Sequence, residues 1–157
     1  MSTWLLAWAL AASTPLEGYV KSCHDGDTCR VEIGGKVASV RLSGVDAPEK
    51  KQPGGLEAQK FMEQKVVGRT VTLRCEGRSY KRRTCAIELD GRDMAEELVR
   101  AGHAWDSPKF SKGRYRAAED EARAGKRGLW AQSSPASPYC FRWKTKAACR
   151  RDLSYMP

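Results

Sequence analysis

The feature that most constrains the fold is a change of hydrophobic period along the chain. Residues 18–42 contain three β-rich segments of alternating polarity, and glycine-containing turn signals separate them. Residues 55–68 instead carry apolar side chains at helical spacing and end in a glycine. Alternation returns in residues 70–75 and 84–89. This pattern predicts three strands, one helix and two more strands.

Two further helices are predicted after the last of these strands. Asp93, with Glu96 three residues later, forms a start that is similar to a capping box, and Gly102 ends this helix. The next helix is expected over about residues 111–124, before Gly125. The order of the elements predicts an α+β domain, in which a five-stranded β-barrel is flanked by about three α-helices.

The 157-residue chain has the length of one domain and can bury a core of its own. Its first 16 residues are uncharged and mostly apolar, but too few for the roughly 20 that span a bilayer. They resemble the apolar region of a secretory signal, although no Lys or Arg precedes them; a buried N-terminal segment is the alternative. We assign residues 1–16 to this signal-like segment, residues 17–132 to the barrel domain and residues 133–157 to a short basic tail.

Six cysteines lie along the chain as three pairs of sequence neighbours. Local pairing predicts three bridges: Cys23–Cys29, Cys75–Cys85 and Cys140–Cys149. None of the six has the C-x-x-C spacing of a zinc site, and unpaired core thiols are the alternative. Because disulfides form in oxidising compartments, we expect a secreted or periplasmic protein.

The charge balance points to a polyanionic partner. The chain has 28 Lys and Arg residues against 19 Asp and Glu residues, a formal net charge of +9. Such a charge suits either nucleic acid or an anionic membrane surface. The sequence lacks a strongly amphipathic basic helix, which places the membrane surface last. We expect a monomer without a membrane span that binds nucleic acid.

Residues 41–51 (RLSGVDAPEKK) gather an arginine, two carboxylates and a proline where the third predicted strand ends. A solvated surface turn would explain this segment taken alone. Three other motifs change that interpretation: residues 24–28 (HDGDT), residues 80–83 (YKRR) and residues 90–105 (DGRDMAEELVRAGHAW). Together the four motifs occur in the order and approximate spacing of the staphylococcal nuclease (thermonuclease, or micrococcal nuclease) family. The chain resembles that family over about residues 18–131.

The resemblance implies an OB-fold barrel flanked by helices, and a Ca²⁺-dependent endonuclease that cleaves DNA and RNA and leaves 3′-phosphate ends. Asp27 and Asp46 match the family's calcium carboxylates, and Ala47 matches the position whose backbone carbonyl completes the protein's share of that site. Calcium takes 6–8 oxygen ligands, which leaves room for water and a phosphate. Asp25 is expected either to support this site or to be a turn residue.

The same resemblance assigns three residues to catalysis. Glu49 matches the glutamate that activates or orients the attacking water, and Arg41 and Arg82 match two phosphate-clamping arginines. The chemistry agrees, because two planar guanidinium groups can stabilise the charge that grows on phosphate oxygens during cleavage.

The basic turn departs from the family pattern, and it also carries the expected substrate contacts. Lys81 stands where the family has glycine, so that Arg83 is an alternative to Arg82 as the second clamp. We expect Tyr80 and Arg83 to bind substrate. The competing functional hypothesis is a non-catalytic OB-fold that binds nucleic acid. Because the chain keeps a candidate for every catalytic position, we favour the nuclease.

Overall fold

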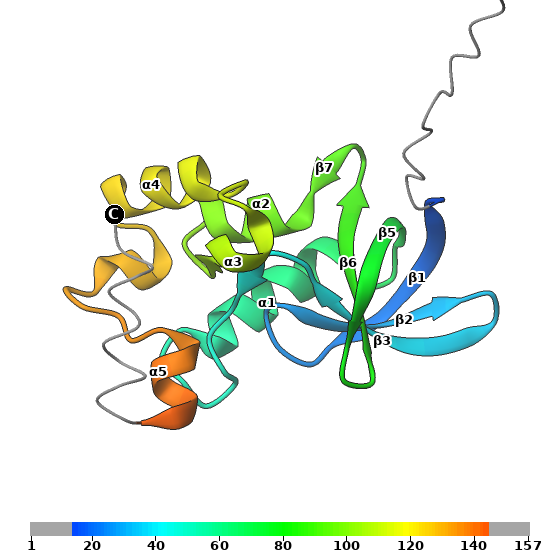
Figure 1. The fold of residues 1–157 in the computed structure, drawn as a ribbon, viewed down its shortest axis with the longest axis horizontal. Coiled ribbons are helices and arrows are strands. Elements are labelled where there is room, and N and C mark those ends of the chain that lie inside the picture. Colours follow the sequence, from blue (N-terminus) through cyan, green and yellow to red (C-terminus); the bar gives the residue numbers. More distant parts are fainter. Residues whose placement is uncertain (1–13, 145–157) are drawn as a thin grey trace, which may run out of the picture.

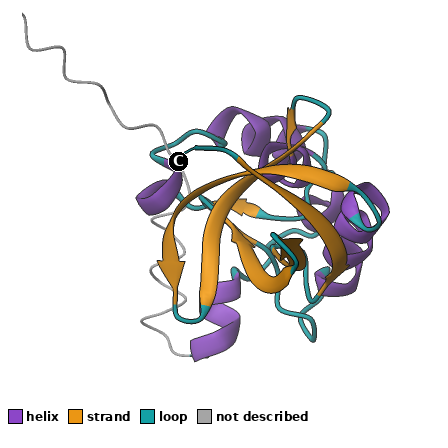
Figure 2. Ribbon diagram, turned by 90° about the vertical axis from the view of Figure 1, so that its right-hand side faces the viewer, coloured by secondary structure: helices purple, strands orange, loops and turns teal. Residues whose placement is uncertain are grey.

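The computed structural model describes residues 14–144, and its centre is a closed barrel of five strands (Figures 1 and 2). The strands are β1 (Leu16–Cys23), β2 (Thr28–Ile33), β3 (Lys36–Leu42), β5 (Thr70–Ser79) and β6 (Arg82–Leu89). Neighbours pair antiparallel in the order β3-β2-β1-β5-β6, and a parallel pairing of β3 with β6 closes the barrel. The predicted α+β fold with an OB-type barrel is confirmed.

Alternation of apolar and polar residues explains why these segments form a barrel. Val20, Val31, Val40, Leu73 and Ile87, one from each strand, are fully buried in one hydrophobic cluster. Because successive side chains of a strand point to opposite faces, the intervening residues lie on the outer face or at the rim. The alternation that is visible in the sequence therefore builds the core.

The three predicted helices correspond to α1 (Gly55–Val66), α2 (Met94–Arg100) and α4 (Arg116–Ala124). The helix expected over about residues 111–124 begins later, at Arg116, because Lys112 and Gly113 both have left-handed backbone angles, with φ of 58° and 80°. A separate one-turn helix, α3 (Pro108–Ser111), precedes these two residues. A 3₁₀ turn, η1 (Gly128–Ala131), follows α4. The sequence analysis did not predict a fifth helix, α5 (Pro138–Trp143), in the tail.

Three two-residue strands complete the described structure: β4 (Val45–Asp46), β7 (Arg92–Asp93) and β8 (Trp105–Asp106). β4 pairs with β8, and this pairing places Asp46 opposite Trp105. β7 extends the barrel sheet beyond β6. The segment that follows β3 is thus held against the helical half of the molecule.

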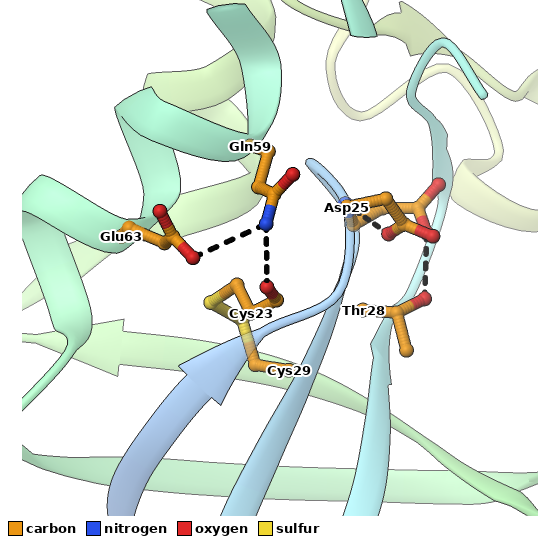
Figure 3. The surroundings of a disulfide bond; sticks show 7 residues. Cys23, Asp25, Thr28, Cys29, Gln59 and Glu63 are labelled. Carbon is orange, nitrogen blue, oxygen red and sulfur yellow. Dashed lines mark hydrogen bonds between the residues drawn. A yellow bond between two sulfur atoms is a disulfide. The ribbon is translucent and has the colours of Figure 1, made fainter. Parts of the chain in front are cut away.

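Two of the three expected disulfides are present. Cys23–Cys29 joins the facing ends of β1 and β2, and Cys75–Cys85 joins β5 to β6. Figure 3 shows the first of them beside α1, where the Gln59 side chain donates a hydrogen bond to the Cys23 carbonyl at 3.0 Å. The third expected bridge includes Cys149, which lies outside the described residues.

The structure describes only part of the N-terminal and C-terminal segments. Residues 1–13, most of the signal-like segment, lie outside the described residues, and Leu16 is already the first residue of β1. Within residues 14–144, no helix combines the length and the apolar character that crossing a membrane requires.

Candidate active site

A cleft of about 910 Å³ opens at one end of the barrel, between the segment that follows β3, the β5–β6 turn and α5. The tip of the β5–β6 hairpin and α5 both lie on the lower side of the molecule in Figure 1. Seven of the eight site residues predicted from the sequence line this cleft: Asp27, Arg41, Asp46, Ala47, Glu49, Tyr80 and Arg82. The eighth, Arg83, is not among its lining residues.

Arg41 lies at the centre of the predicted group and joins its two aspartates. Its Nη1 donates to Asp27 Oδ1 at 2.7 Å, and its Nη2 donates to Asp46 Oδ1 at 3.0 Å. The barrel fixes this arrangement, because β3 pairs with β2 so that Arg41 lies opposite Thr28, next to the aspartate loop. One guanidinium group therefore holds both candidate metal carboxylates.

Asp27 is the most deeply buried of the carboxylates, with 3% of its surface exposed. Its Oδ2 accepts a hydrogen bond from the backbone N–H of Ala47 at 2.9 Å, and its Oδ1 accepts one from the Thr28 hydroxyl at 2.9 Å. Burial raises the pKa of Asp27 to about 7, although the charge of Arg41 opposes the rise. The backbone N–H of Asp27 bonds to Asp25 Oδ1 at 3.1 Å, as expected when Asp25 is a turn residue.

Glu49 and Asp46 share a partner that the sequence analysis missed. Arg142, on α5, donates from Nη1 to Glu49 Oε1 at 2.6 Å and from Nη2 to Asp46 Oδ2 at 3.1 Å. A basic tail gives no local pattern that would assign a role to any one of its arginines. Ser137 followed by Pro138 is a helix-start signal, and it could have indicated α5.

Gln52 connects the Glu49 loop to the same tail. Its Oε1 accepts a hydrogen bond from the Glu49 backbone N–H at 3.1 Å, and its Nε2 donates to the Ala136 carbonyl at 2.7 Å. The Gln52 side chain is buried, so both contacts are sheltered from water. The loop also needs glycine at position 55, because a Cβ there would lie 2.1 Å from the Glu49 carbonyl oxygen.

The two neighbouring arginines of the basic turn lie differently. Arg82 lines the cleft, and its Nη1 lies 3.5 Å from the Thr28 hydroxyl oxygen, beside the Arg41 cluster. Arg83 follows it on β6, and successive strand residues point to opposite faces. Tyr80, at the tip of the turn, has a left-handed backbone (φ 56°) and is 94% exposed.

The donor set fits a hard cation such as calcium. Asp27 and Asp46 offer carboxylate oxygens, which calcium prefers, and water and a phosphate can supply the remaining ligands. The guanidinium of Arg142 already places a positive charge against Asp46 Oδ2. Within residues 14–144, no group of three or more His, Cys, Asp or Glu side chains is arranged to hold an ion. A site with two carboxylates and a backbone carbonyl does not need such a group.

Comparison with known proteins gives one consistent result. The family model described as staphylococcal nuclease homologue matches residues 39–132. The chain is 33% identical to a protein of Escherichia coli O157:H7 named an uncharacterized endonuclease, over 88% of this chain and 92% of that protein. It is 32% identical to an uncharacterized endonuclease of Haemophilus influenzae, over 88% and 79%. It is 36% identical to staphylococcal-like nuclease CAN1 of Arabidopsis thaliana, over 71% of this chain and 35% of that protein.

Proposed function

The chain belongs to the staphylococcal nuclease family and is a nuclease, and from this premise we propose that it is a Ca²⁺-dependent endonuclease. It hydrolyses phosphodiester bonds of DNA and RNA and leaves 3′-phosphate ends. The observation that carries the proposal is the single guanidinium of Arg41, which joins Asp27 to Asp46 in a cleft that Glu49 also lines.

In this proposal, Asp27 and Asp46 hold the calcium ion together with the Ala47 carbonyl. Bound calcium neutralises part of the charge on the phosphate and makes its phosphorus a better electrophile. Arg41 already lies against both aspartates, so its guanidinium is positioned to contact a phosphate oxygen beside them. Arg82 approaches from β6 and supplies the second guanidinium.

Glu49 is the proposed general base. Its carboxylate takes a proton from a water molecule whose oxygen attacks the phosphorus, and the bond between phosphorus and the 5′-oxygen breaks. The leaving 5′-oxygen takes up a proton, so the products are a 3′-phosphate and a 5′-hydroxyl. Arg142 bonds to Glu49 Oε1, so this contact must open or shift before that oxygen can accept a proton.

We propose further that the protein acts as a monomer in an oxidising compartment, either secreted or in a periplasm. The disulfides Cys23–Cys29 and Cys75–Cys85 support that location, because such bonds persist where thiols are not kept reduced.

The test is an assay of plasmid nicking and RNA digestion with calcium, repeated with a chelator. We expect cleavage of both substrates with calcium and none in the chelator. The products should prime a DNA polymerase only after a phosphatase has removed their 3′-phosphates. The Glu49→Gln variant, purified by the same route, controls for contaminating nucleases. Full activity in the chelator would refute the calcium dependence, and products that prime directly would refute the 3′-phosphate assignment.

A further inference from the structure

One face of helix α5 lines the cleft. Tyr139, Arg142 and Trp143 all line it, and their spacing of three and four residues places them on the same side of a helix. The Tyr139 and Trp143 rings lie next to each other, with centroids 6.3 Å apart. The helix thus presents one arginine and two aromatic rings to the space beside Glu49.

Several contacts hold α5 in this position. The Ser137 hydroxyl caps the helix by accepting the backbone N–H of Cys140 at 3.1 Å, and Pro138 is buried. The bond from Gln52 to the Ala136 carbonyl fixes the approach to the helix. Trp143 is therefore carried by a helix that is anchored at its start.

Aromatic rings also reach the cleft from two other directions. Phe110 of α3 and Tyr80 of the β5–β6 turn line it, and they are 68% and 94% exposed. Trp143 is 62% exposed. Rings that line a cleft yet remain exposed offer free faces for stacking, and the basic residues Arg78 and Lys109 line the same space. Aromatic and basic groups in one groove match the bases and phosphates of a nucleic acid.

We propose that α5 is a base-binding wall of the cleft, in which Trp143, supported by Tyr139, stacks an unpaired base next to the scissile phosphate. This inference rests on the proposed function and specifies its substrate class as single-stranded nucleic acid. In a duplex, both faces of each base are covered by its neighbours, so Trp143 has no face to contact. A single strand exposes its bases to such a platform.

Fluorescence anisotropy in a chelator measures binding without cleavage. The probes are a labelled oligothymidylate of about 12 nucleotides, within the roughly 4–16 that one such barrel covers, a duplex of the same length, and a strand whose central nucleotides are abasic. We expect Trp143→Ala to raise the Kd for the oligothymidylate about tenfold, which lies within the roughly 5- to 150-fold that stacking on one aromatic side chain contributes. For the duplex and the abasic strand, the change should stay below about twofold.

Two variants control for indirect effects. Trp143→Phe keeps an aromatic face and should bind like the parent protein. Phe141→Ala removes a ring from the same helix that does not line the cleft, and it should also leave binding unchanged. Circular dichroism checks that each variant is folded.

The outcomes separate this inference from the proposed function. An equal loss of affinity for all three probes would mean that Trp143 only supports the helix, and this would overturn the inference. Unchanged affinity for the oligothymidylate would overturn it as well. Cleavage with calcium is measured independently, so a parent protein that does not cleave, combined with the expected binding pattern, would refute only the proposed reaction.

Discussion

Two arginines from distant parts of the sequence bind the carboxylate of Asp46. Arg41 donates to Asp46 Oδ1 from strand β3, and Arg142 donates to Asp46 Oδ2 from helix α5. The Arg41 side chain is 20% exposed and also holds the buried Asp27, whereas the Arg142 side chain is 39% exposed and also holds Glu49.

The difference separates a fixed half of the site from an adjustable one. Removing one partner from a buried, charged pair costs about 3–5 kcal/mol, because the other charge remains without compensation. An exposed ion pair contributes about 0–1 kcal/mol. The Arg41 contacts are therefore part of the barrel, and those of Arg142 can be exchanged for a phosphate or a metal at little cost.

The largest expected effect comes from the residue that both arginines share. Asp46→Ala removes a calcium ligand and a partner of each guanidinium, so we expect no detectable cleavage and no calcium binding by calorimetry. Asp90→Ala is the matched control, because Asp90 pairs with Arg69 away from the cleft. Retained calcium binding in Asp46→Ala would place the metal elsewhere.

Glu49→Gln tests the carboxylate that, among residues 14–144, forms its ion pair with Arg142. The amide keeps the shape of the side chain but cannot take up the proton of water, so turnover should fall by roughly 10²–10⁴-fold. Affinity for an oligonucleotide should change little, since no proton transfer is involved in binding. Turnover equal to that of the parent protein would assign water activation to another group.

Exchanging each arginine for lysine compares the two halves directly. Arg41→Lys should lower turnover by about 10²–10³-fold, because an ammonium group cannot bridge Asp27 and Asp46 as a planar fork does. Arg142→Lys should lower it less than about tenfold, as expected for an exposed pair. Single-turnover kinetics give both values, and the reverse ranking would show that α5 carries the essential guanidinium.

The basic turn allows a comparison within one strand. Arg82→Ala should cost at least about a hundredfold in turnover, because this side chain lines the cleft and faces charge that grows during cleavage. Arg83→Ala should weaken binding modestly, mainly at low salt, and should make binding less salt-dependent, as expected when a general phosphate contact is lost. If the two effects were exchanged, the second clamp would be Arg83.

A pH dependence of stability should belong to the Arg41 half alone. In calcium-free protein, burial raises the pKa of Asp27 to about 7 from 3.8, so the folded state binds this proton more tightly than the unfolded chain does. The stability that Asp27 contributes is full below about pH 4 and is lost as the pH rises through about 7, with a slope of at most about 1.4 kcal/mol per pH unit.

Chemical denaturation in a chelator at several pH values measures this dependence. Asp27→Asn should flatten it, because the amide does not titrate. Arg142→Ala should leave it unchanged, because Arg142 does not contact Asp27. A dependence that disappears in Arg142→Ala would mean that the two halves of the site are coupled.

The same division explains what the sequence could predict. The five strands were predictable because alternation, a local pattern, decides which side chains enter the core. Arg41 and Asp46 are five residues apart at the end of one strand, so their contact follows from the strand and its turn. The motifs that carry the family resemblance all lie within residues 24–105, before α5.

The α5 half was not predictable by the same means. Arg142 and Glu49 are 93 residues apart, and their contact depends on how the tail docks on the Gln52 loop. A short basic segment with a few aromatic residues has the same composition whether it is solvated or packed. The start of α4 was predicted too early for a different reason: the left-handed backbone of Lys112 and Gly113 delays the helix until Arg116, and the apolar spacing of Tyr115, Ala118 and Ala122 does not reveal it.

The separation of 93 residues from Glu49 to Arg142 also sets the order in which the parts of the site are synthesised. A ribosome releases the chain from its N-terminus, so the carboxylates emerge well before β6, whose pairing with β3 closes the barrel, and α5 follows later still. Until β6 has emerged, the growing chain carries acidic and basic side chains but no assembled cleft. A ribosome-bound chain that stops before residue 80 should therefore leave added RNA intact.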